Sequence, residues 1–259
     1  MANIMVVLPT LGDRIETLKE TLESVKSQSN EVKLRLVVVA PKSAIEARKL
    51  SLSYGAVLVD DPSLGISKAI NSALEIRTEE TYYAWIGDDD IFRPGGLETL
   101  VSLLEASPRA VVAYGGCDYI NPEGMTLVRS RAGKLAQLLL PWGPDLIPHP
   151  GSVIRFDDLI AIGKFDENLK YAMDLDAFLK LRSRGAFVYT KKSVSGFRWH
   201  PESLTVANRL KSSIEAERVK KSHTIWFLRP FASLWLLPVR WASAFLAGRV
   251  NKRAVAKLR

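Results

Sequence analysis

The sequence contains one cysteine, no secretion signal at its start and no apolar run long enough to cross a membrane. Cys117 has no second thiol and no metal-ligand spacing around it. We therefore expect Cys117 to pack as a small apolar residue and the protein to reside in a reducing compartment. The opening segment MANIMVVLPTLGDR lacks the basic and long apolar regions of a signal peptide. These absences predict a cytoplasmic protein without disulfides.

The charge of the 259-residue chain is unevenly distributed. Residues 209–259 hold 12 Lys or Arg and 2 Glu, a net charge of +10. Residues 1–208 hold 24 Lys or Arg and 26 Asp or Glu, a net charge of −2. We therefore predict a domain over residues 1–208 and a basic helical tail over 209–259. A basic tail also suggests nucleic acid, but no recognisable binding motif accompanies it, so no nucleic-acid partner is expected.

Apolar runs alternate with helical patterns through the first hundred residues. The predicted strands cover residues 4–8, 34–39, 56–59 and 83–86, and a helical pattern follows each of them. This alternation predicts an α/β fold with a mostly parallel, Rossmann-like central sheet flanked by helices. Residues 1–115 are expected to form a nucleotide-binding half. From 116 to 208 the pattern loosens, and we expect a less regular wall for a second ligand.

The most informative stretch is YYAWIGDDDIFRPGGL, residues 82–97. A short apolar strand turns through Gly87 into Asp88, Asp89 and Asp90. Adjacent carboxylates repel one another, and a divalent cation that carries a phosphorylated ligand would offset their charge. A solvated acidic loop is the alternative. Because open α/β sheets bind ligands beyond the carboxyl ends of their strands, the position of the triplet favours a metal site.

Five segments in order resemble the family 2 glycosyltransferases. They are VVLPTLGDRIETLKETLESVKSQS, LGISKAINSAL, WIGDDDIFRPGGLETL, HPGSVIRFDDLIAIGKFDENLKYAMDLDAFLKLRSRG and FRWHPESLT. The ordered set is a specific signal, although no segment is specific alone. The resemblance implies a GT-A fold, a nucleotide-diphosphate sugar donor, a divalent metal (Mn²⁺ or Mg²⁺) and inversion at the anomeric carbon.

The resemblance also implies a metal site. Asp89 and Asp90 match the last two acids of the family's Asp-x-Asp-Asp motif, while Gly87 stands in the place of the first acid. We expect Asp89 to bind the metal and Asp90 to support it. His200 matches a stretch that reaches toward the metal or the diphosphate in many GT-A enzymes; a loop histidine bonded to the backbone is the alternative.

The donor corner follows from the same resemblance. Thr10 is expected to contact the base or ribose, and Arg14 the phosphates. Where the family often has Asp-Asp-Gly-Ser, this chain has Ala-Pro-Lys-Ser at residues 40–43, so Asp60 or Asp61 is expected to take over the base contact. For Arg14 and Lys68, an ordinary solvated position on a helix is the alternative. The full predicted donor set is Pro9, Thr10, Arg14, Asp61, Lys68 and Asp88.

Asp174 matches the second residue of the Glu-Asp pair that supplies the family's general base, and Met173 replaces the Glu. One carboxylate is enough to take a proton from an acceptor hydroxyl. A helix N-cap is a compatible second role for Asp174. Asp176 is expected to be a surface acid in the first helical turn or an acceptor contact. His149, between two prolines, is a turn residue or lines the acceptor cleft.

Residues 225–248 are rich in Trp, Phe and Leu, interrupted by two arginines and two prolines. As one helix, this segment would place its polar residues on one side and leave a broad apolar face. Flanking Lys and Arg residues fit anionic head groups, so we predict a peripheral protein on the inner face of the cell membrane. Packing on the domain or on a second subunit is the alternative, and a homo-oligomer remains open.

The resemblance therefore implies an inverting glycosyltransferase of the hexosyl type. By the same resemblance, the expected donor is a UDP-sugar by default, the acceptor a glycan or lipid-linked hydroxyl, and the pathway cell-surface polysaccharide biosynthesis. Two alternatives remain. Gly87 and Met173 keep open a catalytically inactive glycan-binding or scaffold protein at the membrane surface. A nucleotidyltransferase shares the metal and phosphate requirements, but PTLGDR is a poor phosphate loop.

Overall fold

A curled central sheet organises the protein. The computed structural model describes residues 3–30, 32–130, 133–199 and 208–241. The strands follow the order β3-β2-β1-β4-β8-β6-β9-β5, with β7 paired to β6. Their bounds are β1 Asn3–Pro9, β2 Lys33–Ala40, β3 Val57–Asp60, β4 Tyr82–Trp85, β5 Ile91–Phe92, β6 Ala110–Ile120, β7 Thr126–Ser130, β8 Ser152–Arg155 and β9 Ala186–Arg198.

The first four strands pair in parallel, as the sequence pattern predicts. In the second half, β8 runs antiparallel to both β4 and β6, whereas β9 pairs in parallel with β6. Because β1, β2, β3 and β4 point the same way, their carboxyl ends meet at one edge of the sheet. The segments that follow them, including the acidic stretch, lie at that edge.

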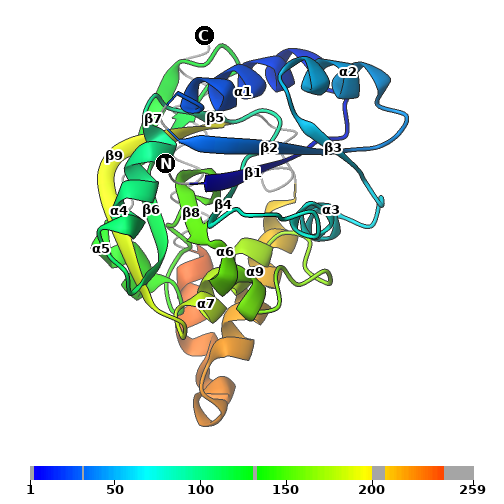
Figure 1. The fold of residues 1–259 in the computed structure, drawn as a ribbon. Coiled ribbons are helices and arrows are strands. Elements are labelled where there is room, and N and C mark those ends of the chain that lie inside the picture. The colour runs from blue at the N-terminus through cyan, green and yellow to red at the C-terminus, as the bar shows by residue number, and fades with distance from the viewer. Residues whose placement is uncertain (1–2, 31, 131–132, 200–207, 242–259) are drawn as a thin grey trace.

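Helices cover both faces of the sheet (Figure 1). Their bounds are α1 Ile15–Gln28, α2 Ile45–Ser53, α3 Ile66–Leu74, α4 Gly96–Glu105, α5 Lys134–Leu139, α6 Phe156–Ala161, α7 Met173–Leu181 and α9 Arg209–His223, with the 3-10 helices η1 His149–Gly151 and η2 Trp226–Phe231. Helices α1, α2 and α4 contribute to one hydrophobic core, and α3, α6 and α7 to the other.

Strand β1 shows how the sequence divides these two cores. Ile4, Val6 and Leu8 face the core of α1, α2 and α4, while Met5 and Val7 face the other, and all five are fully buried. Successive side chains of a strand point to opposite faces. A strand that is apolar on both faces is therefore a central parallel strand covered on both sides.

The tail is helical but is not one continuous helix in its described part. Helix α9 ends at His223 because Thr224 adopts an extended backbone, and η2 contains Pro230 before the helical residues 233–241. The expectation that residues from 225 onward form one continuous amphipathic helix therefore does not hold for the described residues. Among the helices that the structure describes, none combines the length and apolar character needed to cross a bilayer.

Close contact between α4 and β9 predicts a sensitive position. A Cβ at Gly96 would lie 2.4 Å from the carbonyl oxygen of Val194, so the backbone has to move. We expect Gly96→Ala to lower the free energy of unfolding by about 1–3 kcal/mol in urea denaturation. In the matched control Gly133→Ala, no atom lies within 4 Å of the new Cβ, and a change within about 0.5 kcal/mol is expected. Equal effects of the two substitutions would contradict this account of the α4–β9 contact.

Candidate active site

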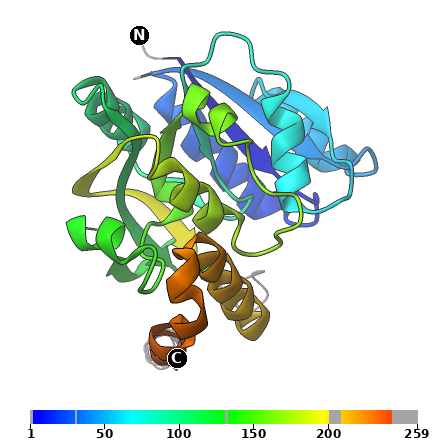
Figure 2. The ribbon, with the colours of Figure 1, turned by 90° about the horizontal axis from the view of Figure 1, so that it is seen from below.

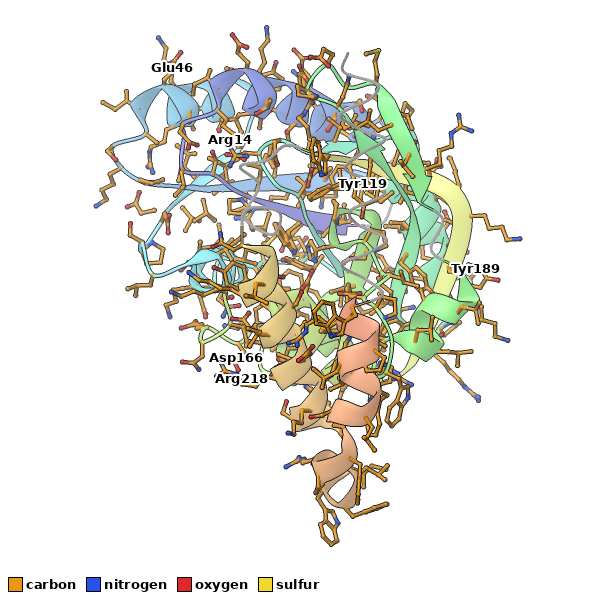
Figure 3. The ribbon with its side chains drawn as sticks, turned by 180° about the vertical axis from the view of Figure 1, so that it is seen from behind. Arg14, Glu46, Tyr119, Asp166, Tyr189 and Arg218 are labelled. Atoms are coloured by element: carbon orange, nitrogen blue, oxygen red, sulfur yellow. The ribbon has the colours of Figure 1, made fainter. Side chains whose placement is uncertain are left out.

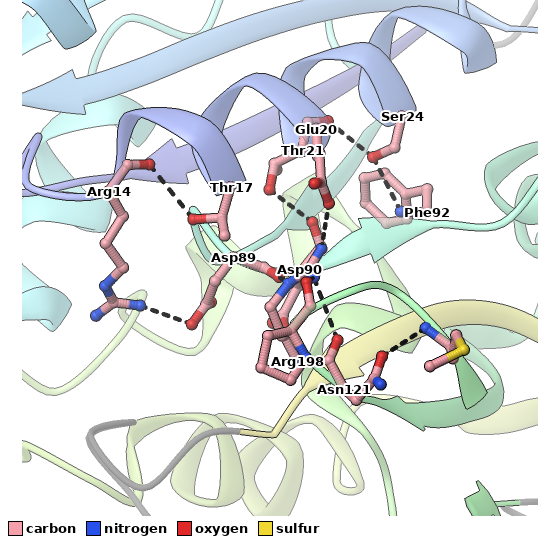
Figure 4. Close-up of polar contacts among 12 residues, drawn as sticks. Arg14, Thr17, Glu20, Thr21, Ser24, Asp89, Asp90, Phe92, Asn121 and Arg198 are labelled. Carbon is pink, nitrogen blue, oxygen red and sulfur yellow. Dashed lines mark hydrogen bonds and ion pairs between the residues drawn. The ribbon is translucent and has the colours of Figure 1, made fainter. Parts of the chain in front are cut away.

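Asp88, Asp89 and Asp90 follow β4 at the carboxyl edge of the parallel strands, and all three are largely withdrawn from solvent. Thr10, directly after β1, donates its hydroxyl to Asp88 Oδ2 at 2.6 Å. Arg14, just before α1, places Nη1 2.6 Å from Asp89 Oδ2 and 3.5 Å from Asp88 Oδ1. The alternative of an ordinary solvated position for Arg14 therefore does not hold, because its guanidinium pairs with Asp89 (Figure 4).

Arg198, the last residue of β9, anchors the acidic loop from the other side (Figure 4). Its backbone N–H donates to Asp90 Oδ1 at 2.9 Å, and its Nε donates to the carbonyl oxygen of Asp89 at 2.8 Å. The Thr21 hydroxyl of α1 donates to the carbonyl oxygen of Asp90 at 2.7 Å. The loop is thus fixed by groups from both ends of the domain sequence.

Burial is the main cause of the raised pKa values of Asp88 and Asp90 in this loop. It raises the pKa of Asp88, although the Thr10 hydrogen bond and the charge of Arg14 oppose the shift. It raises the pKa of Asp90 well above its usual range, with the charge of Asp89 as the next cause. The loop therefore disfavours three full negative charges in the absence of an added cation.

Gly87 leaves a space that two carboxylates border. A Cβ at this position would lie 3.1 Å from Asp89 Oδ1 and 3.3 Å from Asp90 Oδ2, so both oxygens approach the place of the missing side chain. Within the described residues, no group of three His, Cys, Asp or Glu side chains is arranged to hold a metal. Hard cations such as Mg²⁺ often take one or two protein carboxylates and complete their shell with substrate phosphates. The donors present fit that mode of binding.

Asp174 lies in the first turn of α7 and not at its N-cap, because α7 begins at Met173 and its N-cap is Ala172. The Oδ1 atom of Asp174 accepts the N–H of Leu175 at 2.8 Å. Burial raises the pKa of Asp174 to about 6, and the negative charge of Glu215 adds to the shift. The side chain of Asp174 is 24% exposed to solvent. A carboxylate with this pKa and partial access is suited to act as a general base.

His149 borders Asp174 and is the second predicted residue in this corner. Its Nδ1 lies 3.9 Å from Asp174 Oδ2, and among the described atoms neither ring nitrogen has a hydrogen-bond partner. Burial lowers its pKa well below the usual range, so the imidazole is neutral. Its ring packs on Trp85 with 3.8 Å between centroids. Trp85 ends β4, so one strand connects this corner to the acidic loop.

Asp145 belongs to the same corner and was not predicted. Partial loss of hydration and then the charge of Asp174 raise the pKa of Asp145 to about 7, although the residue as a whole is exposed. Lys220 of α9 opposes that shift and donates to the carbonyl oxygen of Gly143. The sequence offered one weak signal for Asp145, an acid within the proline-rich stretch that precedes His149.

Asp176 is not a surface acid. It is buried, and its carboxylate lies 2.7 Å from both His223 Nε2 and Lys180 Nζ. Burial opposes ionisation, but the contact with His223 and the ion pair with Lys180 outweigh it and lower the pKa of Asp176. His223, to which no role was assigned from the sequence, therefore connects the end of α9 to α7.

Glu215 of α9 is a further unpredicted residue. Its Oε1 accepts the consecutive backbone N–H groups of Lys170, Tyr171 and Ala172 at 3.0, 2.6 and 2.8 Å. These amides immediately precede α7. Glu215 thus holds the turn that presents Asp174, from a helix more than 40 residues further along the chain. No local sequence pattern could reveal a contact of that range.

The remaining predicted residues are spread along the edge. Pro9 ends β1 beside Thr10, and Asp61 follows β3, where its Oδ1 accepts the N–H of Ser63 at 2.9 Å. Lys68 points to Glu167 and not to the acids, since its Nζ pairs with Glu167 Oε1 at 3.1 Å. His200 lies outside the described residues, two positions after Arg198.

Comparison with known proteins identifies the family. The profile described as glycosyl transferase family 2 matches residues 5–163. The chain belongs to glycosyl transferase family 2. An uncharacterized glycosyltransferase of Rickettsia prowazekii is 26% identical over 174 residues, which cover 63% of this chain and 54% of the relative. One from Rickettsia felis is 26% identical over 196 residues, or 71% of this chain and 32% of the relative. This chain therefore spans about half or less of these family 2 relatives.

Two solved structures share the fold of this family 2 chain. The mannosyltransferase PcManGT from Pyrobaculum calidifontis, in complex with GDP-Man and Mn²⁺, superimposes with a TM-score of 0.66 at 17% identity over 99% of this chain and 81% of its own. S. aureus TarS 1-349, in complex with UDP-GlcNAc, gives a TM-score of 0.64 at 16% identity over 92% and 71%. The GT-A fold expected from the sequence is confirmed.

The contacts of Glu215 predict two effects on the base corner. Glu215→Ala leaves three N–H groups without their carboxylate and should lower the free energy of unfolding by about 2 kcal/mol. Glu215→Gln keeps an oxygen acceptor and should lower the free energy of unfolding by a smaller amount than Glu215→Ala. Both changes remove a negative charge and should move the pKa of Asp174 below about 6, which NMR titration of its carboxyl carbon measures. An unchanged pKa in both variants would rule out this role of the Glu215 charge.

Proposed function

We propose that this family 2 glycosyltransferase moves a sugar from a nucleotide-diphosphate donor to an acceptor hydroxyl with inversion at the anomeric carbon. One observation carries the proposal. Strand β4 ends in Trp85, which packs on His149 beside Asp174, and the chain then enters the acidic loop at Gly87. The acidic loop therefore directly follows the strand whose last residue packs beside the candidate base, so the proposed phosphate-binding corner and the base adjoin, as a single displacement between two substrates requires.

The donor is proposed to bind at the edge formed by β1, β3 and the acidic loop. Thr10 and Pro9 would border the nucleoside, Asp61 the base, and Arg14 with Asp88 the ribose and diphosphate. Lys68 remains a proposed donor contact and would have to leave Glu167. The complexes of TarS with UDP-GlcNAc and of PcManGT with GDP-Man support a nucleotide-sugar donor, and UDP is the default choice.

Asp89, supported by Asp90, is proposed to hold Mn²⁺ or Mg²⁺, with His200 as a further candidate ligand. Such an ion, when bound, supplies positive charge to the leaving diphosphate. Arg14 already faces Asp89 and adds a second positive charge at this place. Residues 1–115 would thus form the donor half of the domain in 1–208, and residues 116–208 the acceptor half.

Asp174 is proposed to act as the general base. Its carboxylate takes the proton of the acceptor hydroxyl, the hydroxyl oxygen forms a bond to the anomeric carbon, and the bond from that carbon to the diphosphate oxygen breaks. The electron pair of the broken bond leaves with the nucleotide diphosphate. Neutral His149 would line the acceptor position, and Asp176 would border it through its contact with His223.

The acceptor is proposed to be a glycan or lipid-linked hydroxyl, and the sugar a hexose, in cell-surface polysaccharide biosynthesis. The apolar and basic composition of residues 209–259 supports a peripheral position on the inner face of the cell membrane. A homo-oligomer is compatible with this proposal.

Calorimetry tests the donor site. UDP or GDP, titrated with Mn²⁺ present, should bind, and a chelator should weaken binding at least about tenfold if Asp89 and Asp90 hold the ion. Asp89→Ala should abolish the metal-dependent part of the nucleotide affinity. Asp118→Ala is a matched control, because this buried acid lies on β6 and pairs with Arg93. Absence of nucleotide binding to the unaltered protein would reject the proposed donor site.

The rate of transfer should follow the ionisation of Asp174. Because the base must be deprotonated, kcat should be constant well above pH 6 and fall about tenfold per pH unit well below the pKa of about 6. Asp174→Asn should lower kcat by about 10²–10⁴-fold and leave nucleotide affinity unchanged.

Steady-state kinetics over pH measures both effects, and NMR of the product gives the anomeric configuration. A product that retains the donor configuration would contradict the single displacement. Full turnover in Asp174→Asn would exclude Asp174 as the base.

A further inference from the structure

The described part of the tail forms a helical hairpin that projects from the domain. Helix α9 runs away from the sheet, the chain turns at η2, and residues 233–241 return beside α9 (Figures 1 and 2). A contact between Arg240 and Glu217 joins the two arms. Figure 3, with Arg218 labelled on α9, shows the same projection from behind.

The hairpin exposes a dense set of large apolar side chains. Their exposed fractions range from 40 to 77%, and they are Ile225, Trp226, Phe227, Phe231, Leu234, Leu237 and Trp241. Within this stretch Ala232 and Leu236 are buried and hold the hairpin together. So many exposed apolar side chains in one short segment are unusual for a free protein surface and indicate a binding surface.

The apolar surface continues onto the loop that leads to the base corner. Trp142 packs against Trp235 with 5.4 Å between ring centroids, and Trp142 and Leu146 remain 43% and 42% exposed. Asp145 and His149 belong to the same loop and the η1 helix that follows it. The exposed aromatics therefore adjoin the segment that lines the base corner.

Helix α9 makes the second connection between the hairpin and the base corner. His223, its last residue, contacts Asp176, two positions after Asp174 on α7. Lys220 donates to the carbonyl oxygen of Gly143, next to Trp142. The apolar segment begins directly after this helix, so the hairpin and the base corner share one wall.

Charge favours a lipid surface over a second copy of the chain as the occupant. Residues 209–259 carry +10, and exposed Lys221 and Arg229 flank the start of the apolar segment. Two such tails would repel one another, whereas anionic head groups attract Lys and Arg. Exposed Trp and Phe beside basic residues are typical of segments that lie in the interface of a bilayer.

We propose that residues 225–241, together with Trp142 and Leu146, dock on an anionic lipid bilayer and place the Asp174 corner next to the head groups. The docking surface stands independently of the reaction. Its consequence for the acceptor rests on the proposed function: a lipid-linked acceptor with a polar head group would present its hydroxyl to Asp174 while its chain stays in the bilayer.

Sedimentation with vesicles tests the docking surface. The full chain is mixed with vesicles of phosphatidylcholine alone or with added phosphatidylglycerol. We expect at least about tenfold stronger binding to the anionic vesicles, reduced about tenfold or more in the double variant Trp226→Ser/Phe227→Ser. The matched control is Ile45→Ser/Leu52→Ser, two exposed apolar residues of α2, which should bind as the unaltered chain does.

Two results would overturn the docking proposal. One is equal vesicle binding by the unaltered chain and Trp226→Ser/Phe227→Ser. The other is a dimer in analytical ultracentrifugation that this variant abolishes, since the surface would then join two copies. Nucleotide binding, measured by calorimetry on the same proteins, separates the two proposals. Vesicle binding without any nucleotide binding rejects the proposed function and leaves the docking surface standing.

Discussion

The repulsion among three consecutive carboxylates is the constraint on which the arrangement of this domain depends. Asp88, Asp89 and Asp90 are largely withdrawn from solvent, and burial makes their mutual repulsion stronger than it would be in water. The fold offsets it with Thr10 and Arg14 from the β1–α1 connection and with Arg198 from the end of β9. The first and last strands of the domain thus meet at one loop.

The acidic loop receives contacts from both the parallel and the mixed part of the sheet. Four parallel strands bring the ends of β1 and β4 together, which is enough to place Thr10 beside Asp88. Arg198 reaches the loop because β9 runs parallel to β6 and pairs with the short strand β5, which directly follows the acids. The mixed second half therefore completes a site that the parallel half begins.

Much of the first half could be predicted from sequence, because each of its strands is an apolar run followed by a helix with its own periodic stripe. The acids at 88–90 were visible for the same reason, as they interrupt that pattern at a strand end. Strand β9 was not predicted, since its middle, TKKSVS, is polar and lacks a strong strand pattern.

The base corner was only partly predictable. Asp174 and His149 carried a family signal, whereas Trp85, Asp145 and Glu215 act through contacts between distant segments. The family assignment covers residues 5–163 and therefore does not extend to Asp174 or the tail. The position of Asp176 was misjudged because a first-turn acid is usually solvated, and here α9 covers it and supplies His223.

Helix α9 has a consequence for how this protein can change in evolution. One face of it supplies Glu215, Lys220 and His223 to the wall around Asp174, and its end leads into the exposed aromatic hairpin. A tail of this kind cannot be exchanged as an independent module, because replacing it would also remove the carboxylate that holds the turn before α7. Substitutions that alter how the hairpin is attached to the domain and substitutions that alter the pKa of Asp174 therefore fall on the same fifteen residues.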